Sequence, residues 1–211
     1  PYYSAASGRT FSENPRIQAG RCGPDHVGWH FVRDGQVPNH VVHNKPMSNR
    51  RILVVSAEVA PFAKVGGLAD VAQALPKALR ALGHDARIFM PAYPIVLREL
   101  GNAVATIAKN FQVKVNPHWT VTATLYESVI DGVPVYLIGG RGIFDGVNRS
   151  EEVYTLSREC YLFFAQSVIN ACEQAGWIPD VVHANDWHTG FAPVMIREKG
   201  GPGWEQTASV F

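Results

Sequence analysis

A lysine and two neighbouring glycines form the first group of residues whose types suggest chemistry. Lys64, Gly66 and Gly67 lie between a short apolar run and a segment with helical periodicity. Glycine lets the backbone adopt unusual dihedral angles and lets a ligand approach closely. A helix that begins here presents unpaired N–H groups and the positive end of its dipole, and Lys64 adds a mobile positive charge. The combination predicts a site for a phosphate or diphosphate. The alternative is a tight strand-to-helix turn with a solvated lysine.

This glycine-rich loop does not match two common nucleotide-binding patterns. It is neither the GxGxxG of dinucleotide-binding folds nor the GxxxxGK[ST] of a P-loop, and both patterns come with a defined strand–turn–helix context. We therefore expect no bound nucleotide cofactor of either kind, and no cofactor in general.

The second group of polar residues is the segment 183–190, which reads His-Ala-Asn-Asp-Trp-His-Thr-Gly. We expect His188 to hydrogen-bond a ligand or a backbone carbonyl across a cleft. Asp186 is expected to orient the loop or to cap a helix. Trp187 is expected to pack against the protein rather than stack on a substrate. His183 is expected at a strand end, bonded to a backbone partner.

The two histidines of this segment also raise the question of a metal site. His183 and His188 are five positions apart with an aspartate between them. At a junction between a strand and a helix their side chains would not share a face, and no third group of ligands follows. We therefore expect no metal ion.

Strands and helices must position both motifs, and hydrophobic periodicity predicts where they lie. Short β-branched runs, typical of strands buried on both faces, directly precede each motif. The predicted strands are 51–56, 87–90, 113–115, 121–126, 133–138 and 180–184; the predicted helices are 68–82, 151–174 and 189–199. This alternation predicts an α/β fold with a parallel sheet covered by helices. Ligands of such sheets bind beyond the carboxyl ends of the strands, where both motifs lie.

Several residues are expected to set the helix boundaries. Gly83 should end the first helix, Pro76 should kink it, and Thr189 should cap the last one. The segment 151–174 is expected to be a single long helix. The last residues, 207–211, resemble the beginning of a further strand.

Composition excludes several classes of protein. The chain has 211 residues, 46% apolar and 18% charged, with a formal charge of +1. Nucleic-acid binding needs a basic excess, so no nucleic-acid partner is expected. No apolar run approaches the roughly 18 residues of a membrane span, so no membrane partner is expected either. Cys22, Cys160 and Cys172 cannot all pair, and we interpret them as thiols in a reducing, cytoplasmic compartment.

The first 46 residues differ from the rest of the chain. They contain five prolines, five glycines and no leucine, without helical or strand periodicity. We interpret residues 1–46 as an irregular or disordered leader without chemistry, either an upstream extension or an ordinary tail. The domain is expected to span 47–211 and to be incomplete at its carboxyl end.

The loop motif resembles a known family. Residues 64–71, Lys-Val-Gly-Gly-Leu-Ala-Asp-Val, follow Ser-Ala-Glu at 56–58 and a strand. They closely resemble the amino-terminal signature of bacterial glycogen synthases and plant starch synthases, and 183–190 looks like the second landmark of that family. The resemblance covers 47–211. It implies the Rossmann-like, parallel-sheet amino-terminal half of a GT-B glycosyltransferase, with a β-rich middle section.

The resemblance also implies an activity and two partners. The enzyme would transfer glucose from ADP-glucose to the non-reducing end of an α-1,4-glucan such as glycogen or starch, with retention of configuration. Lys64 and the N–H groups of Gly66, Gly67 and Leu68 would stabilise the diphosphate as the glycosyl–phosphate bond breaks.

Four further residues take roles by the same resemblance. His188 would position the glucosyl ring, and Asp145 would hold sugar hydroxyls or contact the acceptor. The family's Arg-Pro-Gly is expected after that aspartate, but residues 146–148 are Gly-Val-Asn here. Glu58 would bind acceptor glucan or brace the loop, and Asp186 would orient its own loop.

The family is also expected to need a second, carboxy-terminal GT-B domain. That domain would supply most nucleotide contacts and an essential arginine, lysine and glutamate, so the polypeptide alone is expected to be inactive. One alternative is a non-catalytic module that binds glucan or a nucleotide sugar. Another is a different GT-B enzyme, such as a sucrose synthase or a bacterial sugar transferase.

Overall fold

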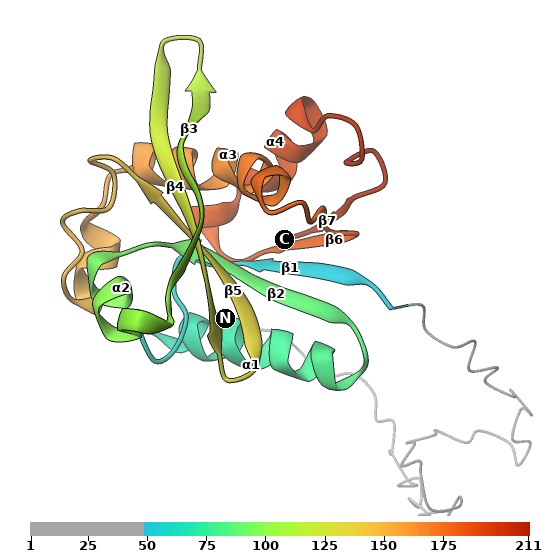
Figure 1. Ribbon diagram of the computed structural model, residues 1–211, viewed down its shortest axis with the longest axis horizontal. Helices are drawn as coiled ribbons and strands as arrows, with labels where there is room; N and C mark the ends of the chain where they lie inside the picture. Colours follow the sequence, from blue (N-terminus) through green and yellow to red (C-terminus); the bar gives the residue numbers. More distant parts are fainter. Residues whose placement is uncertain (1–48) are drawn as a thin grey trace, which may run out of the picture. The chain divides into compact units, whose positions relative to one another are not determined.

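The computed structural model of the protein describes residues 49–211, so the leader expected over residues 1–46 lies outside the described residues. Within the described part, the strands form one seven-stranded sheet in the order β3-β4-β5-β2-β1-β6-β7 (Figure 1). Helices cover both faces of this sheet. The predicted α/β class is confirmed.

Five strands form the parallel part of the sheet. Each pairs in parallel with its neighbour, from β5 through β2, β1 and β6 to β7. In chain order these are the third, second, first, fourth and fifth parallel strands, so the direction of the order reverses between β1 and β6. Their bounds are β1 Arg51–Val55, β2 Asp85–Pro91, β5 Val133–Gly140, β6 Val181–Ala184 and β7 Ala208–Val210. The further strand expected at 207–211 is present as β7.

The middle of the chain adds two antiparallel strands at one edge. β3 (Ala105–Asn116) and β4 (Trp119–Ile130) form a hairpin that projects beyond the helices in Figure 1, and β4 pairs with β5. Asp131 and Gly132, at the β4–β5 turn, both have positive φ, as a tight two-residue hairpin turn requires. The β-rich middle section is therefore present. Its strands are longer than the ranges 113–115 and 121–126 because most β3 residues are not buried and show little apolar alternation.

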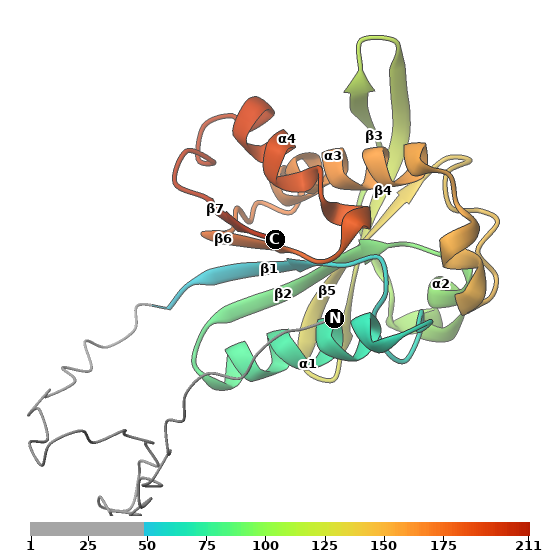
Figure 2. The ribbon, with the colours of Figure 1, turned by 180° about the vertical axis from the view of Figure 1, so that it is seen from behind.

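Helices lie on opposite faces of the sheet. α1 (Gly67–Ala81) covers one face, while α3 (Arg158–Gln174) and α4 (Ala192–Lys199) cover the other (Figures 1 and 2). The short helix α2 (Pro94–Leu100) and the 3-10 turn η1 (Gly101–Ala103) connect β2 to β3. Pro76 lies inside α1, and Gly83 follows the helix with a φ of +92°.

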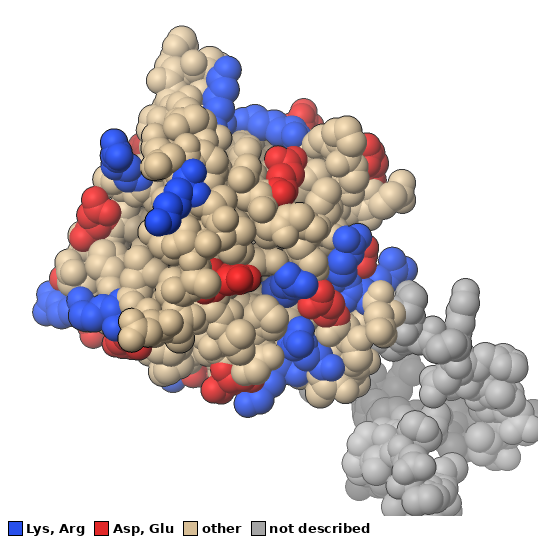
Figure 3. All heavy atoms as spheres, in the orientation of Figure 1, with Lys and Arg blue, Asp and Glu red and all other residues tan. Residues whose placement is uncertain are grey.

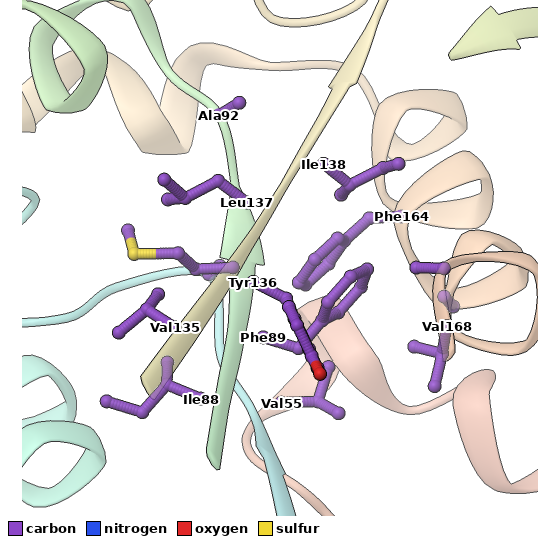
Figure 4. Packing of buried hydrophobic residues seen from close by; sticks show 14 of the residues in the cluster. Val55, Ile88, Phe89, Ala92, Val135, Tyr136, Leu137, Ile138, Phe164 and Val168 are labelled. Atoms are coloured by element: carbon purple, nitrogen blue, oxygen red, sulfur yellow. The ribbon is translucent and has the colours of Figure 1, made fainter. Parts of the chain in front are cut away.

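The core lies mainly between the sheet and α3. Phe89 of β2 and Phe164 of α3 stack with their ring centroids 5.3 Å apart and their planes 3° apart. Figure 4 shows Val55, Tyr136 and Val168 around this pair. A smaller cluster of Ile52, Val54 and Ala86 packs beneath α1 with partly buried leucines. Packing on both sides fixes the sheet, and with it the loops at its carboxyl edge.

The prediction of one helix over 151–174 is wrong. The structure has a 3-10 turn, η2 (Ser150–Thr155), then extended backbone, then α3. The Glu152 carboxylate accepts hydrogen bonds from the N–H groups of Asn148 and Arg149, and Thr155 Oγ1 donates to the Glu152 carbonyl. These local side-chain bonds satisfy backbone groups within a separate turn and so compete with a continuous helix.

The expected cap at Thr189 is also wrong. Asp186 caps the 3-10 turn η3 (Trp187–Thr189) by accepting from the Trp187 N–H at 2.6 Å. Thr189 Oγ1 instead donates to the carbonyl of Asn185, and α4 begins three residues later with Pro193 in its first turn. Proline suits that position because its missing N–H has no partner in a first turn.

The surface of the described residues carries charged side chains of both signs. On the face seen in Figure 3, basic and acidic side chains are interspersed rather than gathered into one patch. Among residues 49–211, no helix is both long enough and apolar enough to cross a membrane.

Candidate functional site

The two sequence motifs meet at the point where the strand order reverses. Residues 56–66 follow β1, and residues 185–190 follow the adjacent β6. The Asn185 backbone N–H and side-chain amide both donate to the Val55 carbonyl, at 3.0 and 3.1 Å, and so tie the two strand ends together. In open α/β sheets, a crevice for ligands lies outside the carboxyl ends of the strands at such a point.

Gly66 and Gly67 do not have the unusual backbone angles that the sequence suggested. Gly66 is the N-cap of α1 with an extended backbone (φ −140°), and Gly67 is the first helical residue. A Cβ atom built on either glycine has no heavy atom within 4 Å. The expectation of special dihedral angles is therefore wrong, and the fold does not require glycine here. Open space for a close approach to the backbone remains.

One of the three expected N–H donors is already occupied. The Glu58 carboxylate oxygen Oε2 accepts from the N–H groups of Val65 and Gly66, at 2.7 and 3.1 Å. Glu58 is fully buried, so its contacts match the alternative in which it braces the loop. Within residues 49–211, the N–H groups of Gly67 and Leu68 have no acceptor. They form the open end of the helix.

Lys64 lies at the same helix end. Its ammonium Nζ is 2.7 Å from Asp70 Oδ1 in the first turn of α1, and both side chains are about half exposed, at 48% and 57%. The Lys64 backbone N–H donates to Ser150 Oγ at 3.2 Å. The lysine charge and two unbonded N–H groups are thus together at one helix N-terminus, an arrangement that attracts anions.

His188 is buried, with 1% of its surface exposed, among aromatic side chains. Its ring stacks on Trp187 at 4.0 Å between centroids and meets the edges of Tyr161 and Tyr154 at 4.7 and 5.1 Å. Neither ring nitrogen has a hydrogen-bond partner. Asp186 Oδ2 lies 3.9 Å from Nδ1, which is too far for a hydrogen bond.

The protonation of His188 follows from this environment. Burial lowers the pKa of His188 from its ordinary value of 6.5, and the negative charges of Asp186 and Glu58 offset this only in part. The imidazole is therefore neutral near pH 7 and offers one donor and one acceptor. Buried polar atoms without partners are rare and call for an explanation, such as a role in a site.

Asp186 and Trp187 both make contacts within the protein. Asp186 has a positive φ of 63° and holds the loop by capping η3, as described above. Trp187 packs against His188 and against the Tyr161 ring at 5.2 Å, while 49% of its surface stays exposed. The side chain of His183, on β6, has no hydrogen-bond partner in the part of the chain that the structure describes; its carbonyl accepts from Asn185.

Asp145 lies apart from the other predicted residues. It is exposed and, among the described residues, has no hydrogen bond to Lys64 or His188. It lines a separate cavity of about 270 Å³ beyond the ends of β2 and β5. The same cavity is also lined by Asn110, Tyr126 and Arg141. The structure therefore brings together Glu58, Lys64, Gly66, Gly67 and Leu68 near β1, and places Asp145 in its own pocket.

Sequence reasoning missed two residues that contact the site. The Tyr154 hydroxyl donates to Glu58 Oε1, and its ring contacts His188; Ser150 accepts from the Lys64 backbone. Both belong to η2, whose residues from 151 onward the sequence pattern assigns to a long helix. Ser157, followed by Glu159 in the first turn of α3, is a typical helix start and is the signal that would have separated η2.

The cysteines and possible metal ligands add little to the site. Cys172 is buried and Cys160 partly buried, both as free thiols, and burial raises the pKa of Cys172. Cys22 lies outside the described residues. In residues 49–211, no three His, Cys, Asp or Glu side chains gather as metal ligands do.

Comparison with known proteins shows the family to which the sequence is similar. Residues 51–211 match the family model of the starch synthase catalytic domain. The chain is 41% identical over 157 residues to a glycogen synthase of Trichodesmium erythraeum, covering 70% of this chain and 30% of the relative. It is 38% identical over 152 residues to a glycogen synthase of Photobacterium profundum, covering 71% and 30%.

A solved structure shares the fold. The catalytic domain of starch synthase IV from Arabidopsis thaliana, bound to ADP and acarbose, superposes with a TM-score of 0.68 at 24% identity. The match covers 77% of this chain and 33% of that one. The chain thus spans about a third of the length of these relatives. With most of its described residues matched by the family model, the chain belongs to the starch synthase catalytic domain family.

Proposed function

We propose that the chain supplies the amino-terminal half of a retaining glucosyltransferase. The enzyme transfers glucose from ADP-glucose to the non-reducing end of an α-1,4-glucan, in glycogen or starch synthesis. Family membership and the glycogen synthases among the relatives support this proposal. So does the Arabidopsis structure, whose ADP contains the diphosphate that the proposal assigns to the Lys64 loop.

The observation on which the proposal chiefly rests is the open end of α1. The unbonded N–H groups of Gly67 and Leu68 lie beside the Lys64 ammonium, where the strand order reverses. When the glycosyl–phosphate bond breaks, negative charge builds up on the diphosphate. Fixed donors at that place stabilise the developing charge without reorganising, which lowers the barrier.

His188 and Asp145 are proposed to contact the sugars. The neutral His188 imidazole has two unsatisfied nitrogens beneath Trp187 and Tyr154, which are about half exposed at 49% and 44%. A glucosyl hydroxyl that displaces the Trp187 ring would satisfy a nitrogen and be oriented by it. Asp145, in its polar cavity, would hold hydroxyls of the sugar or of the acceptor chain.

The rest of the active site is proposed to come from a carboxy-terminal GT-B domain. The relatives are about three times as long as the matched region, which leaves room for such a domain. It would bind most of the nucleotide and close over the Lys64 loop, excluding water. We place the complete enzyme in the cytoplasm, where the free thiols Cys160 and Cys172 stay reduced.

The test is a transfer assay with a completed protein. The chain is joined to the carboxy-terminal part of the Trichodesmium erythraeum relative and given labelled ADP-glucose or UDP-glucose with glycogen. We expect label to enter glycogen from ADP-glucose, and none from the chain alone. Glucan binding without transfer would favour a non-catalytic module, and transfer from UDP-glucose alone would favour a different GT-B enzyme.

A further inference from the structure

The 3-10 turn η2 contacts the Lys64 loop at two points. Ser150 Oγ accepts a hydrogen bond from the Lys64 N–H at 3.2 Å. The Tyr154 hydroxyl donates to Oε1 of Glu58, whose other oxygen accepts from Val65 and Gly66. The Glu58 carboxylate therefore joins the Tyr154 hydroxyl to the N–H groups of Val65 and Gly66.

The Glu58 carboxylate depends on these donors. It is fully buried, and a buried carboxylate is stable only where its oxygens accept hydrogen bonds. Two of its donors are backbone groups of the loop, and Tyr154 supplies the one side-chain donor recorded for Glu58 among residues 49–211. Burial and the bond to Glu58 raise the pKa of Tyr154, so its hydroxyl keeps the proton it donates.

Tyr154 also contacts the second half of the site. Its ring meets the edge of His188 with the centroids 5.1 Å apart and the planes 63° apart. Glu58 and Tyr154 are 96 positions apart in the sequence. Tyr154 is the residue of η2 that contacts both Glu58 and His188. One side chain therefore connects the end of β1 to the motif after β6.

We propose that Tyr154 is a positioning residue that fixes the open end of α1 relative to His188. This inference rests on the proposed role of the Lys64 loop as the diphosphate site. With the Gly66 N–H held on Glu58, the following N–H groups of Gly67 and Leu68 are fixed in direction, because consecutive peptide units begin one helix. Through its ring, the same tyrosine sets the distance from these donors to the imidazole.

The test compares Tyr154→Phe with Tyr136→Phe. The first variant removes the hydroxyl bonded to Glu58 and keeps the ring on His188. The second is a matched control, because it removes a tyrosine hydroxyl bonded to a charged side chain, Arg87 of β2, and not to Glu58. Amide hydrogen exchange is measured on the chain itself, and inorganic pyrophosphate is titrated while the Gly67 and Leu68 amide resonances are followed.

We expect Tyr154→Phe to accelerate exchange at Val65 and Gly66 at least about fivefold, the effect of losing roughly one hydrogen bond. The Kd of Tyr154→Phe for pyrophosphate should rise at least about fivefold. Tyr136→Phe should match the unaltered protein in both measurements. Because the Kd is read from folded molecules, a merely stabilising role of Tyr154 would leave it unchanged. A third variant, Tyr154→Leu, should in addition shift the ring signals of His188.

Two different failures are distinguishable. Unaltered protein that does not shift its Gly67 and Leu68 resonances with pyrophosphate would contradict the diphosphate function itself. If the unaltered protein does bind pyrophosphate and Tyr154→Phe binds it with the same Kd, the positioning role alone is contradicted. Unchanged amide exchange at Val65 and Gly66 in Tyr154→Phe would contradict it as well.

Discussion

Lys64 Nζ lies 2.7 Å from Asp70 Oδ1, so the cation assigned to the diphosphate is paired with a carboxylate in the first turn of α1. Both side chains are about half exposed, and such pairs contribute only about 0–1 kcal/mol to stability. The ion pair keeps the ammonium beside the open helix end at little cost in free energy. A diphosphate, which carries two negative charges, can therefore compete with Asp70 for the ammonium.

Replacing Lys64 should separate catalysis from stability. In the completed enzyme, Lys64→Ala should lower turnover by roughly 10²–10³, the usual loss for one transition-state donor. The free energy of unfolding should change by less than about 1 kcal/mol. Steady-state kinetics and urea denaturation measure the two effects. Lys77→Ala is the control, since Lys77, on α1, also forms an exposed ion pair, with Asp131. Equal turnover in both variants would refute the role of Lys64.

Adding a methyl group to the helix end tests whether a ligand approaches it. Gly67→Ala has open space around its Cβ and no positive φ, so it should keep stability or raise it by about 0.4–1 kcal/mol. Pyrophosphate binding should nevertheless weaken, because the methyl group obstructs approach to the backbone. Thermal melting and titration check this, with Gly201→Ala, which is equally open, as the control. Undiminished pyrophosphate binding would exclude close approach at Gly67.

The pKa of His188 should lie below its ordinary value of 6.5. Because burial lowers the pKa of folded His188 below 6.5, the unfolded chain takes up this proton more readily. The contribution of His188 to stability is therefore complete above the unfolded pKa and is lost as pH falls through 6.5 toward the folded value. The surrounding groups are Asp186, Glu58, Tyr154 and Tyr161, of which the two carboxylates act in the opposite direction. Imidazole NMR shifts, assigned with a His188→Gln variant, would contradict this if the midpoint were at or above 6.5.

Gly140 tests the packing beneath α3. A Cβ at this position would lie 2.7 Å from Phe163 Cε1 and 2.8 Å from Ile143 Cγ1, well inside van der Waals contact. Gly140→Ala should therefore cost about 1–3 kcal/mol, the typical cost of overpacking a core. Gly139→Ala is the neighbouring control, with its nearest contact 3.4 Å away, and it should cost less. Urea denaturation of the two variants compares them, and equal values would show that the core yields freely at Phe163.

The parts of the fold that could be predicted from the sequence have short-range causes. The strands near 51–56 and 180–184 are buried on both faces, so they appear as uninterrupted apolar runs. α1 has a single apolar stripe and ends before a glycine with positive φ. Because the carboxyl ends of parallel strands share one edge, the meeting of the two motifs also followed from the element order.

The break between η2 and α3 has no comparable signal in the hydrophobic pattern. Helical spacing of apolar residues continues across the break, at Val153, Leu156 and Cys160. Hydrophobic periodicity therefore does not reveal the extended residues between η2 and α3. What separates the turn is the Glu152 carboxylate, which bonds the backbone ahead of it. The Tyr154–Glu58 contact spans 96 positions and appears only when the chain is folded.

The candidate site was predictable in place but not in detail. Lys64, Gly67 and Leu68 lie together as expected, because a helix start fixes its own first residues. The use of the Gly66 N–H by Glu58 depends on a buried carboxylate reaching across the loop, which spacing does not encode. Asp145 stands after β5, which β2 and β1 separate from β6, and the sequence contained no measure of that separation.

The neighbouring positions of β1 and β6 also determine when the site can form during synthesis. Val55 and Asn185 bond to each other although 130 positions separate them. While the ribosome is still making the middle of the chain, β1 has β2 beside it on one edge and an unpaired edge on the other. Closing so long a loop is slow relative to local folding. The open end of α1 and His188 are therefore joined late, and a nascent chain stalled before β6 exposes a strand edge open to aggregation.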